Sequence, residues 1–353
     1  MKPTGVLMVG SVPGASPQEV FTRLVTALPG RLEAVPDGET GDRWNYIGWQ
    51  LKRFPRVARR NELGGTPLPE DGAGLPTFTL ADIEPTAYDE AALSSYAEFK
   101  QLREQNVIPA NVRFQIGLPS PYSVLVGHVK PELANVIEPL YEQRFAETLH
   151  RIVEHIPHDD LVIQWDLCFE MTGLEFDRGR PLEARHKPYF SSPGGVLQGL
   201  ANRVARLSEG IPKDVKLAFH LCYGDLRHKH FVEPEDTSLL VEFANALLAR
   251  ETLGSRTEWI HLPVPKERTD ADYFLPLTRL KLDSSKPPYI YLGVVHANDE
   301  AGTKKRIETA RATVPFHFGV ATECGLGRTP PEEIDSVLRI CKEVTAGRIQ
   351  EDL

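Results

Sequence analysis

Short apolar segments alternate with longer amphipathic segments along much of this chain. The apolar segments have the length of strands, and we predict strands at residues 6–9, 113–116, 161–165, 216–220, 259–262, 290–294 and 317–321. Helical spacing of apolar residues predicts helices at residues 131–156, 193–209, 237–250, 304–312 and 331–344. Strands that alternate with helices are typical of a parallel sheet covered by helices.

About eight such units close into a (β/α)8 barrel of the TIM type, and 353 residues are enough for one. An open doubly wound sheet is the alternative, but no Gly-x-Gly-x-x-Gly turn follows the first strand, which disfavours its nucleotide-binding form. Residues 53–86 are rich in Pro and Gly and too long for an ordinary connection, so we predict an extended functional loop or lid there. No repeat or linker divides the sequence, and we expect a single domain over residues 1–353.

Charge and composition narrow the classes of partner. The net charge of -9 argues against a nucleic-acid partner, which needs a clustered basic face. No apolar run approaches the roughly 20 residues that span a bilayer, and the N-terminus lacks the apolar region of a secretory signal. We therefore expect a cytoplasmic protein with no membrane partner. Its four cysteines suggest no disulfide framework, and in a reducing cytosol cysteines beside histidine favour metal or catalytic chemistry.

Polar and thiol side chains follow four of the predicted strands. These residues are Asp166, His220, His296 and Cys324. In a barrel of parallel strands all four positions lie on the C-terminal rim, where catalytic groups converge. The sequence therefore predicts the active site at this end of the barrel.

Three of the rim residues form a candidate zinc site. In His220-Leu221-Cys222 the two side chains share a face of an extended chain, and nitrogen and sulfur donors suit zinc. Cys324, followed by glycines, supplies another thiolate from another strand end. Two thiolates and one imidazole leave a fourth position open for a substrate thiol, which would be held as thiolate. We expect Cys168 to line or pack beside the pocket and Cys341 to be a buried structural thiol.

Segments spread from Val9 to Leu326 carry a resemblance to a known family. They are Val9-Gly10-Ser11-Val12-Pro13, Asp37-Gly38-Glu39, Ile116-Gly117-Leu118-Pro119-Ser120-Pro121, Gln164-Trp165-Asp166, His220-Leu221-Cys222-Tyr223 and Glu323-Cys324-Gly325-Leu326. In this order they resemble the catalytic barrel of cobalamin-independent methionine synthase, in the superfamily that includes uroporphyrinogen decarboxylase.

The resemblance implies a role for each matching residue. His220, Cys222 and Cys324 would be zinc ligands. Ser11, Glu39 and Asp166 would contact the amino-acid part of a thiol substrate, with the two carboxylates suited to its ammonium group. Asp166 and His296 would be the catalytic pair, His296 protonating the departing group, since imidazole titrates near neutral pH.

The sequence also departs from the family pattern. The family's fourth zinc ligand is a Glu at the end of the strand after His-x-Cys, where this chain has Trp259-Ile260-His261-Leu262-Pro263. Either His261 substitutes for that carboxylate or the site has three protein ligands. The family's Glu-Pro-Ala run is replaced by Leu167-Cys168-Phe169-Glu170.

Three functions follow from these residues. The leading one is a zinc-dependent transferase that moves a methyl or other alkyl group from a donor to a small thiol, with a corrinoid protein and a second copy of the chain open as partners. The alternatives are a metal-free lyase resembling uroporphyrinogen decarboxylase, for which Arg43 is available, and a non-catalytic barrel that binds zinc and a thiol.

Overall fold

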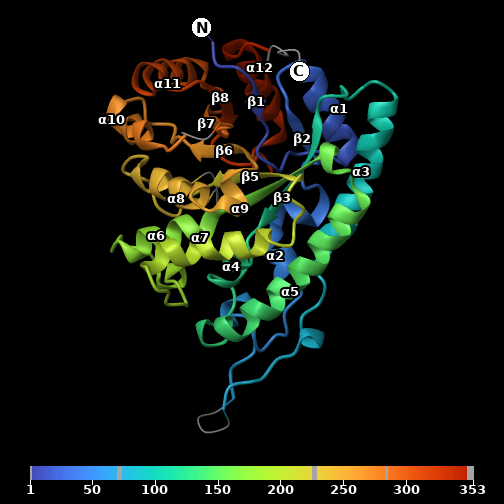
Figure 1. The fold of residues 1–353 in the computed structure, drawn as a ribbon, viewed down its shortest axis with the longest axis vertical. Helices are drawn as coiled ribbons and strands as arrows, with labels where there is room; N and C mark the ends of the chain where they lie inside the picture. Colours follow the sequence, from blue (N-terminus) through green and yellow to red (C-terminus); the bar gives the residue numbers. More distant parts are fainter. Residues whose placement is uncertain (1, 70–73, 225–228, 283–284, 348–353) are drawn as a thin grey trace.

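The computed structural model describes residues 2–69, 74–224, 229–282 and 285–347, and their strands form a (β/α)8 barrel of the TIM type (Figure 1). All eight strands pair in parallel, in the order β1-β8-β7-β6-β5-β4-β3-β2. They are β1 (Val6–Leu7), β2 (Ala34–Pro36), β3 (Arg113–Pro119), β4 (Leu161–Leu167), β5 (Lys216–Leu221), β6 (Thr257–Pro263), β7 (Tyr289–Val295) and β8 (Phe318–Thr322). A parallel bridge between Ser11 and Gly38, just beyond β1 and β2, brings the two ends of the sheet together.

Helices surround the strands (Figure 1). They are α1 (Pro17–Ala27), α2 (Tyr46–Leu51), α3 (Tyr88–Glu104), α4 (Pro121–Leu125), α5 (Pro131–His155), α6 (Cys168–Asp177), α7 (Gly195–Ser208), α8 (Ser238–Leu248), α9 (Glu251–Gly254), α10 (Ala271–Phe274), α11 (Glu300–Thr313) and α12 (Ile334–Val344). Short 3-10 turns are η1 (Gly41–Asn45), η2 (Asn61–Leu63), η3 (Leu80–Asp82), η4 (His158–Asp160), η5 (Ala184–His186), η6 (Leu275–Arg279) and η7 (Pro331–Glu333). No helix in the described ranges is long and apolar enough to cross a membrane.

The hydrophobic pattern predicted this architecture, and seven of the strands lie where it placed them. It missed β2, which has only three residues and ends in Pro36, a residue that cannot donate to a strand ladder. Beyond β4 the chain does not stay extended, because Cys168 is the first residue of α6. The predicted helix at residues 304–312 begins earlier, at Glu300, where the Asp299 side chain accepts a hydrogen bond from the Gly302 N–H.

The barrel interior is layered, with an apolar layer below a polar one. Inward-facing residues of the apolar layer are Leu7, Val9, Ala34, Val162, Ala218, Trp259, Tyr291 and Ala321. Two residues further along β4, Gln164 donates to the Val9 carbonyl at 2.7 Å and to Asp166 at 2.8 Å. Its own amide oxygen accepts from the Trp259 indole at 3.1 Å. Because inward positions recur every second residue, the same rows of side chains continue upward into the barrel mouth.

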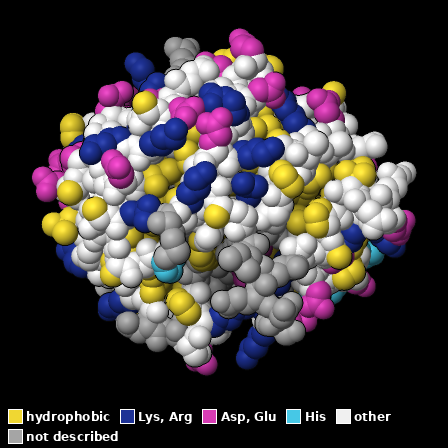
Figure 2. All heavy atoms as spheres, turned by 90° about the horizontal axis from the view of Figure 1, so that it is seen from above, with side chains coloured by type: hydrophobic (Ala, Val, Ile, Leu, Met, Phe, Trp, Pro, Cys, Tyr) yellow, Lys and Arg dark blue, Asp and Glu magenta, His cyan; other side chains and the backbone are white. Residues whose placement is uncertain are grey.

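The face of the molecule that is seen from above in Figure 2 has mixed charge. Figure 2 shows Lys and Arg side chains interspersed with Asp, Glu and hydrophobic side chains on this face. Not every basic residue of α11 contributes to this face. Arg306 is 1% exposed and donates to the carbonyls of Val294 and Lys266.

The predicted extended loop is present, and its described parts, residues 53–69 and 74–86, contain only η2 and η3. It reaches away from the barrel beyond α5 (Figure 1). Lys130, which precedes α5, fastens it by donating to the carbonyls of Val57 at 2.9 Å, Thr66 at 2.8 Å and Arg59. None of its described residues lines the carboxylate pocket analysed below.

We expect Lys130→Met to loosen this loop, because three buried or partly buried carbonyls lose a charged donor. The free energy of unfolding should fall by about 1–3 kcal/mol, and limited proteolysis within residues 53–69 should accelerate. Lys52→Met is the matched control. The Lys52 side chain is 66% exposed, and it forms a surface ion pair with Asp42 at 3.6 Å. Equal proteolysis of the two variants would contradict the anchoring role.

Candidate metal and thiol site

His220, Cys222 and Cys324 come together at the mouth of the barrel. One donor atom from each residue lies within 4.8 Å of the other two. The Cys222 and Cys324 sulfurs are 3.5 Å apart, and the Cys324 sulfur is 3.7 Å from Nε2 of His220. His220 is the inward-facing residue near the end of β5, and Cys222 follows it by two positions, so both side chains point the same way.

These distances fit a tetrahedral zinc site. Zinc–sulfur bonds of about 2.3 Å and zinc–nitrogen bonds of 2.0–2.1 Å place tetrahedral ligands about 3.8 Å (sulfur to sulfur) and about 3.6 Å (sulfur to nitrogen) apart. The observed separations lie within a few tenths of an ångström of these values. The donor set, two sulfurs and one imidazole nitrogen, is also the set that zinc prefers.

The protein surroundings do not favour free thiolates or a charged imidazole here. A hydrogen bond with Cys168 and burial raise the pKa of the Cys222 thiol well above its usual range. Burial, with His261 nearby, lowers the pKa of His220 well below its usual range. The Gly224 N–H donates to the Cys222 sulfur at 3.1 Å. A cation bound among these groups would supply the charge that stabilises the thiolates.

His261 stands behind His220 and is not a fourth donor to the cluster. Its Nδ1 lies 2.7 Å from Nδ1 of His220, and its Nε2 lies 2.9 Å from the Thr322 carbonyl oxygen. Both ring nitrogens are thus engaged, which favours the second of the two alternatives, a site with three protein ligands. In the described part of the chain, the group that could hold a metal ion consists of three residues.

Two carboxylates line a pocket beside the thiol cluster. Asp166 is the Cα partner of His220 across β4 and β5, and Glu39 reaches in from the loop after β2. A Cβ at Gly117 would lie 3.1 Å from Asp166 Oδ2 and 3.3 Å from Glu39 Oε1, so the absence of a side chain there lets the carboxylates converge. A Cβ at Gly10 would lie 2.7 Å from Glu39 Oε1. The cavity between these side chains is small, with a volume of about 30 Å³.

The turn that carries Glu39 is held in an uncommon conformation. Gly38 and Glu39 both have positive φ, 79° and 52°. The buried Asp37 braces the turn, because Oδ1 accepts from the Glu39 N–H at 2.9 Å and Oδ2 accepts from Ser95 at 2.6 Å. Arg43 forms an ion pair with Asp37 at 2.8 Å. These contacts fix the turn so that Glu39 reaches into the pocket.

The pocket disfavours the charged forms of its carboxyl groups. Burial, followed by the charge of Asp37, raises the pKa of Glu39 to about 7. Burial, followed by Glu39, raises the pKa of Asp166 well above its usual range. Tyr46 lines the same pocket, and its pKa is raised by burial and then by Cys168, Glu170, Cys222 and Asp166. The Tyr46 side chain is therefore near enough to interact with both the Asp166 carboxyl and the Cys168 and Cys222 thiols.

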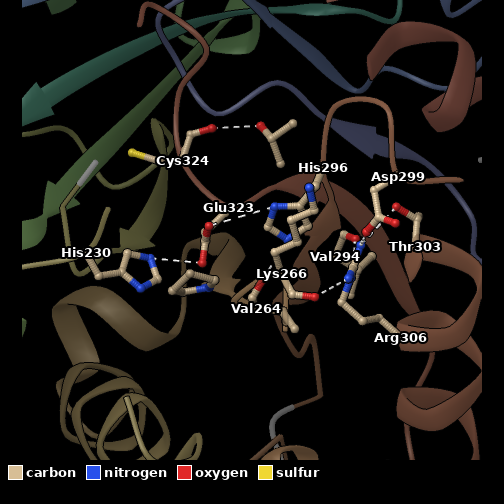
Figure 3. Close-up of polar contacts among 12 residues, drawn as sticks. His230, Val264, Lys266, Val294, His296, Asp299, Thr303, Arg306, Glu323 and Cys324 are labelled. Atoms are coloured by element: carbon tan, nitrogen blue, oxygen red, sulfur yellow. Dashed lines mark hydrogen bonds and ion pairs between the residues drawn. The ribbon is translucent and has the colours of Figure 1, made fainter. Parts of the chain in front are cut away.

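His296 lies next to Glu323 and is not part of the group formed by His220, Cys222 and Cys324. Its Nε2 is 2.9 Å from the Val264 carbonyl and its Nδ1 is 3.9 Å from Glu323 Oε2. Figure 3 shows His230 and His296 on opposite sides of Glu323, with the Cys324 sulfur directed away from His296. Burial lowers the pKa of His296. Ion pairs with Glu233 and Glu323 outweigh burial and raise the pKa of His230 to about 10.

Ser11 connects the loops that follow β1, β2 and β8. Its hydroxyl accepts from the Gly327 N–H at 3.1 Å, and its carbonyl accepts from the Leu326 N–H at 2.6 Å. It also forms the bridge to Gly38. The predicted substrate contact of Ser11 is not tested by these bonds, which instead tie the Cys324 loop to the Glu39 turn.

Several polar residues of the mouth escaped the sequence analysis. Glu170 is buried at the start of α6 and accepts hydrogen bonds from Ser120 and, at 2.6 Å, from Ser123. His230 and Glu323 form the ion pair described above. Glu323 directly precedes Cys324, and that adjacency was the available signal. His230 occurs in no pattern that marks it. Glu170 stands in the segment that replaces the family's Glu-Pro-Ala run, but the sequence assigned it no role, because its partners Ser120 and Ser123 come from a distant segment.

No protein-family model matches the sequence, and no curated protein matches it. A solved structure shares the fold: a B12-independent methionine synthase from Shewanella sp. W3-18-1 in complex with selenomethionine. The match has a TM-score of 0.56 and 12% sequence identity, and covers 97% of this chain and 96% of that chain. The likeness extends over nearly the whole of both chains and establishes the architecture.

The raised pKa of Glu39 predicts a pH-dependent effect of Glu39→Gln. Because the pKa rises from 4.5 to about 7 on folding, the protonated carboxyl favours the folded state below pH 4.5, and this contribution is lost as pH rises toward 7. The stability of Glu39→Gln relative to the native protein should therefore increase by roughly 1–3 kcal/mol between pH 4.5 and 7. Urea unfolding at several pH values measures it.

The exposed Glu90→Gln is the control for that experiment, and its stability difference should not change over this range. A difference between Glu39→Gln and the native protein that is constant with pH, or that falls toward pH 7, would contradict the assignment.

Proposed function

We propose that this protein is a zinc-dependent transferase that moves a methyl or other alkyl group to the sulfur of a small thiol. The observation that carries the proposal is the convergence of His220, Cys222 and Cys324 within 4.8 Å, with the two separations from the Cys324 sulfur close to tetrahedral-edge values, beside a pocket of buried carboxylates. The shared fold with a methionine synthase supports a reaction of this kind. Zinc, when bound, acts as a Lewis acid that holds a substrate thiol as thiolate at neutral pH.

The chain's own residues would bind and orient the thiol substrate. Glu39 and Asp166 supply negative charge in a buried pocket, where an ammonium group would satisfy both carboxylates and stabilise their ionised forms. Asp166 and His220 are neighbours on adjacent strands, so a substrate with its amine on Asp166 has its sulfur within reach of the metal cluster. An amino-thiol is the acceptor that this arrangement suits.

The alkyl transfer itself forms one bond and breaks one. The thiolate sulfur attacks the alkyl carbon of the donor, the carbon–donor bond breaks, and its electron pair leaves with the donor, which takes up a proton. In this proposal His296 passes that proton through Nδ1, which faces Glu323, while its Nε2 is held by the Val264 carbonyl. The donor remains open among a corrinoid, a folate and an aromatic methyl ether.

The metal-free lyase alternative finds less support in the charge of the pocket. A substrate with several carboxylates needs facing Arg side chains, but the Arg43 guanidinium is paired with Asp37 at 2.8 Å. Asp37, Glu39 and Asp166 would repel such a substrate. The non-catalytic barrel differs from the proposed transferase only in turnover, so an assay distinguishes them.

We expect the purified protein to contain about one zinc ion per chain, and Cys222→Ser and Cys324→Ser each to lose it. Each change removes a thiolate that bonds zinc directly, so affinity should fall at least about 100-fold, together with thiol alkylation. Elemental analysis and chelator competition measure the metal. Cys341→Ser is the matched control, because Cys341 is buried in α12 away from the cluster.

A native protein that binds no zinc yet alkylates thiols would overturn the proposal. A protein that holds zinc but turns over no member of a panel of thiols and methyl donors would favour the non-catalytic alternative.

Recognition of the amine should separate two classes of thiol. With homocysteine as acceptor, Glu39→Gln and Asp166→Asn should each lower kcat/KM by roughly 10- to 100-fold, since a hydrogen bond to a charged group contributes ~1.5–3 kcal/mol. With the matched thiol that lacks the amine, the same variants should behave like the native protein. Equal losses with both thiols would place the carboxylates in another role, and Glu90→Gln again provides the control.

A further inference from the structure

Two buried histidines lie ring beside ring behind the metal cluster. His220 on β5 and His261 on β6 are Cα partners, and they are 4% and 0% exposed. Their Nδ1 atoms are 2.7 Å apart, and Nε2 of His261 is 2.9 Å from the Thr322 carbonyl oxygen. The remaining ring nitrogen, Nε2 of His220, is 3.7 Å from the Cys324 sulfur. These contacts connect the Thr322 carbonyl on β8, through His261 on β6 and His220 on β5, to the Cys324 sulfur.

We propose that His261 is a positioning residue that fixes the tautomer of His220, so that Nε2 of His220 presents its lone pair to the two sulfurs. A carbonyl oxygen only accepts, so the proton of His261 must be on Nε2. Its Nδ1 then accepts, and the proton of His220 must be on Nδ1. Only this assignment leaves a lone pair on the ring nitrogen that faces the cluster. The inference rests on the proposed function in taking that nitrogen as a zinc donor.

The surroundings favour two neutral rings over a charged pair. In the described ranges, no hydrogen bond or ion pair joins either ring to a carboxylate. An additional proton shared between them would be a buried charge without a counter-ion, which is costly. With one proton on each ring, the order of donors and acceptors is set by the Thr322 carbonyl alone.

The strand between β6 and β8 has no side chain at the point where the hydrogen bond from His261 to Thr322 crosses it. His261 on β6 reaches Thr322 on β8 across β7, and the residue of β7 at this point is Gly293. A Cβ at Gly293 would lie 3.1 Å from His261 Nε2 and 2.9 Å from the Thr322 carbonyl oxygen. Any larger residue would crowd this hydrogen bond. The Thr322 hydroxyl in turn donates to the Cys324 carbonyl at 2.7 Å, so the histidine chain and the Cys324 loop are held by one residue.

The tautomers can be read in the metal-free protein, independently of zinc binding and activity. Long-range ¹H–¹⁵N correlation spectra of histidine-labelled protein, assigned with variants at the two positions, should show His220 protonated at Nδ1 and His261 protonated at Nε2. A spectrum with His220 protonated at Nε2 overturns the inference, even where the native protein binds zinc normally. Failure to bind zinc with these tautomers intact would instead count against the proposed function.

Zinc affinity of matched variants tests the consequence. His261→Leu removes the acceptor, and chelator competition should show a roughly 10- to 100-fold weaker zinc site. His261→Asn, whose amide oxygen can occupy the place of Nδ1, should restore affinity to within a few-fold of the native value. His128→Leu is the control, because His128 is buried and bonded to the Val124 carbonyl in another part of the barrel. Native affinity in His261→Leu, or equal losses in the Leu and Asn variants, would refute the positioning role.

Discussion

The register between β4, β5 and β6 is the constraint on which the site depends. Asp166, His220 and His261 are consecutive Cα partners across these strands, so their side chains face the barrel interior at one level. Parallel pairing with a period of two then carries Cys222 to the next level up, toward the mouth. A shift of one residue in any of these pairings would turn a donor outward, into the layer between sheet and helices.

Barrel closure matters as much as strand register. Cys324 lies beyond β8, which is next to the β1 end of the sheet order, and Glu39 lies beyond β2, at the other end. Ser11 holds them near each other, because it bonds to the Gly327 N–H on one side and bridges Gly38 on the other. The candidate metal ligands and the carboxylate pocket are therefore parts of one site only because the sheet is closed.

The mouth combines groups that are fully satisfied with groups that are not. Below it, Gln164 uses its amide to bond Val9, Asp166 and Trp259, as buried polar groups generally require. In the layer above Gln164, the carboxyl groups of Glu39 and Asp166 are buried close to each other, and the pKa values of both are raised. A cation from outside the chain would stabilise such a pair, and this is the physical reason for the role in substrate recognition proposed for it.

The sequence by itself determined the architecture and the residues of the candidate metal site. Alternating apolar segments and helical patterns were enough for the barrel, since they follow from local periodicity, although the three-residue β2 gave too little signal. His220, Cys222 and Cys324 were identifiable because thiols and imidazole at strand ends are rare outside metal chemistry.

Only the tertiary structure decided the role of His261, which depends on where its two nitrogens point. It also placed His230 against Glu323 and Glu170 against the Ser120 turn, contacts between segments 50 or more residues apart. Hydrogen-bond direction and the pairing of buried charge are set by neighbours in space, and no local pattern in the chain records them.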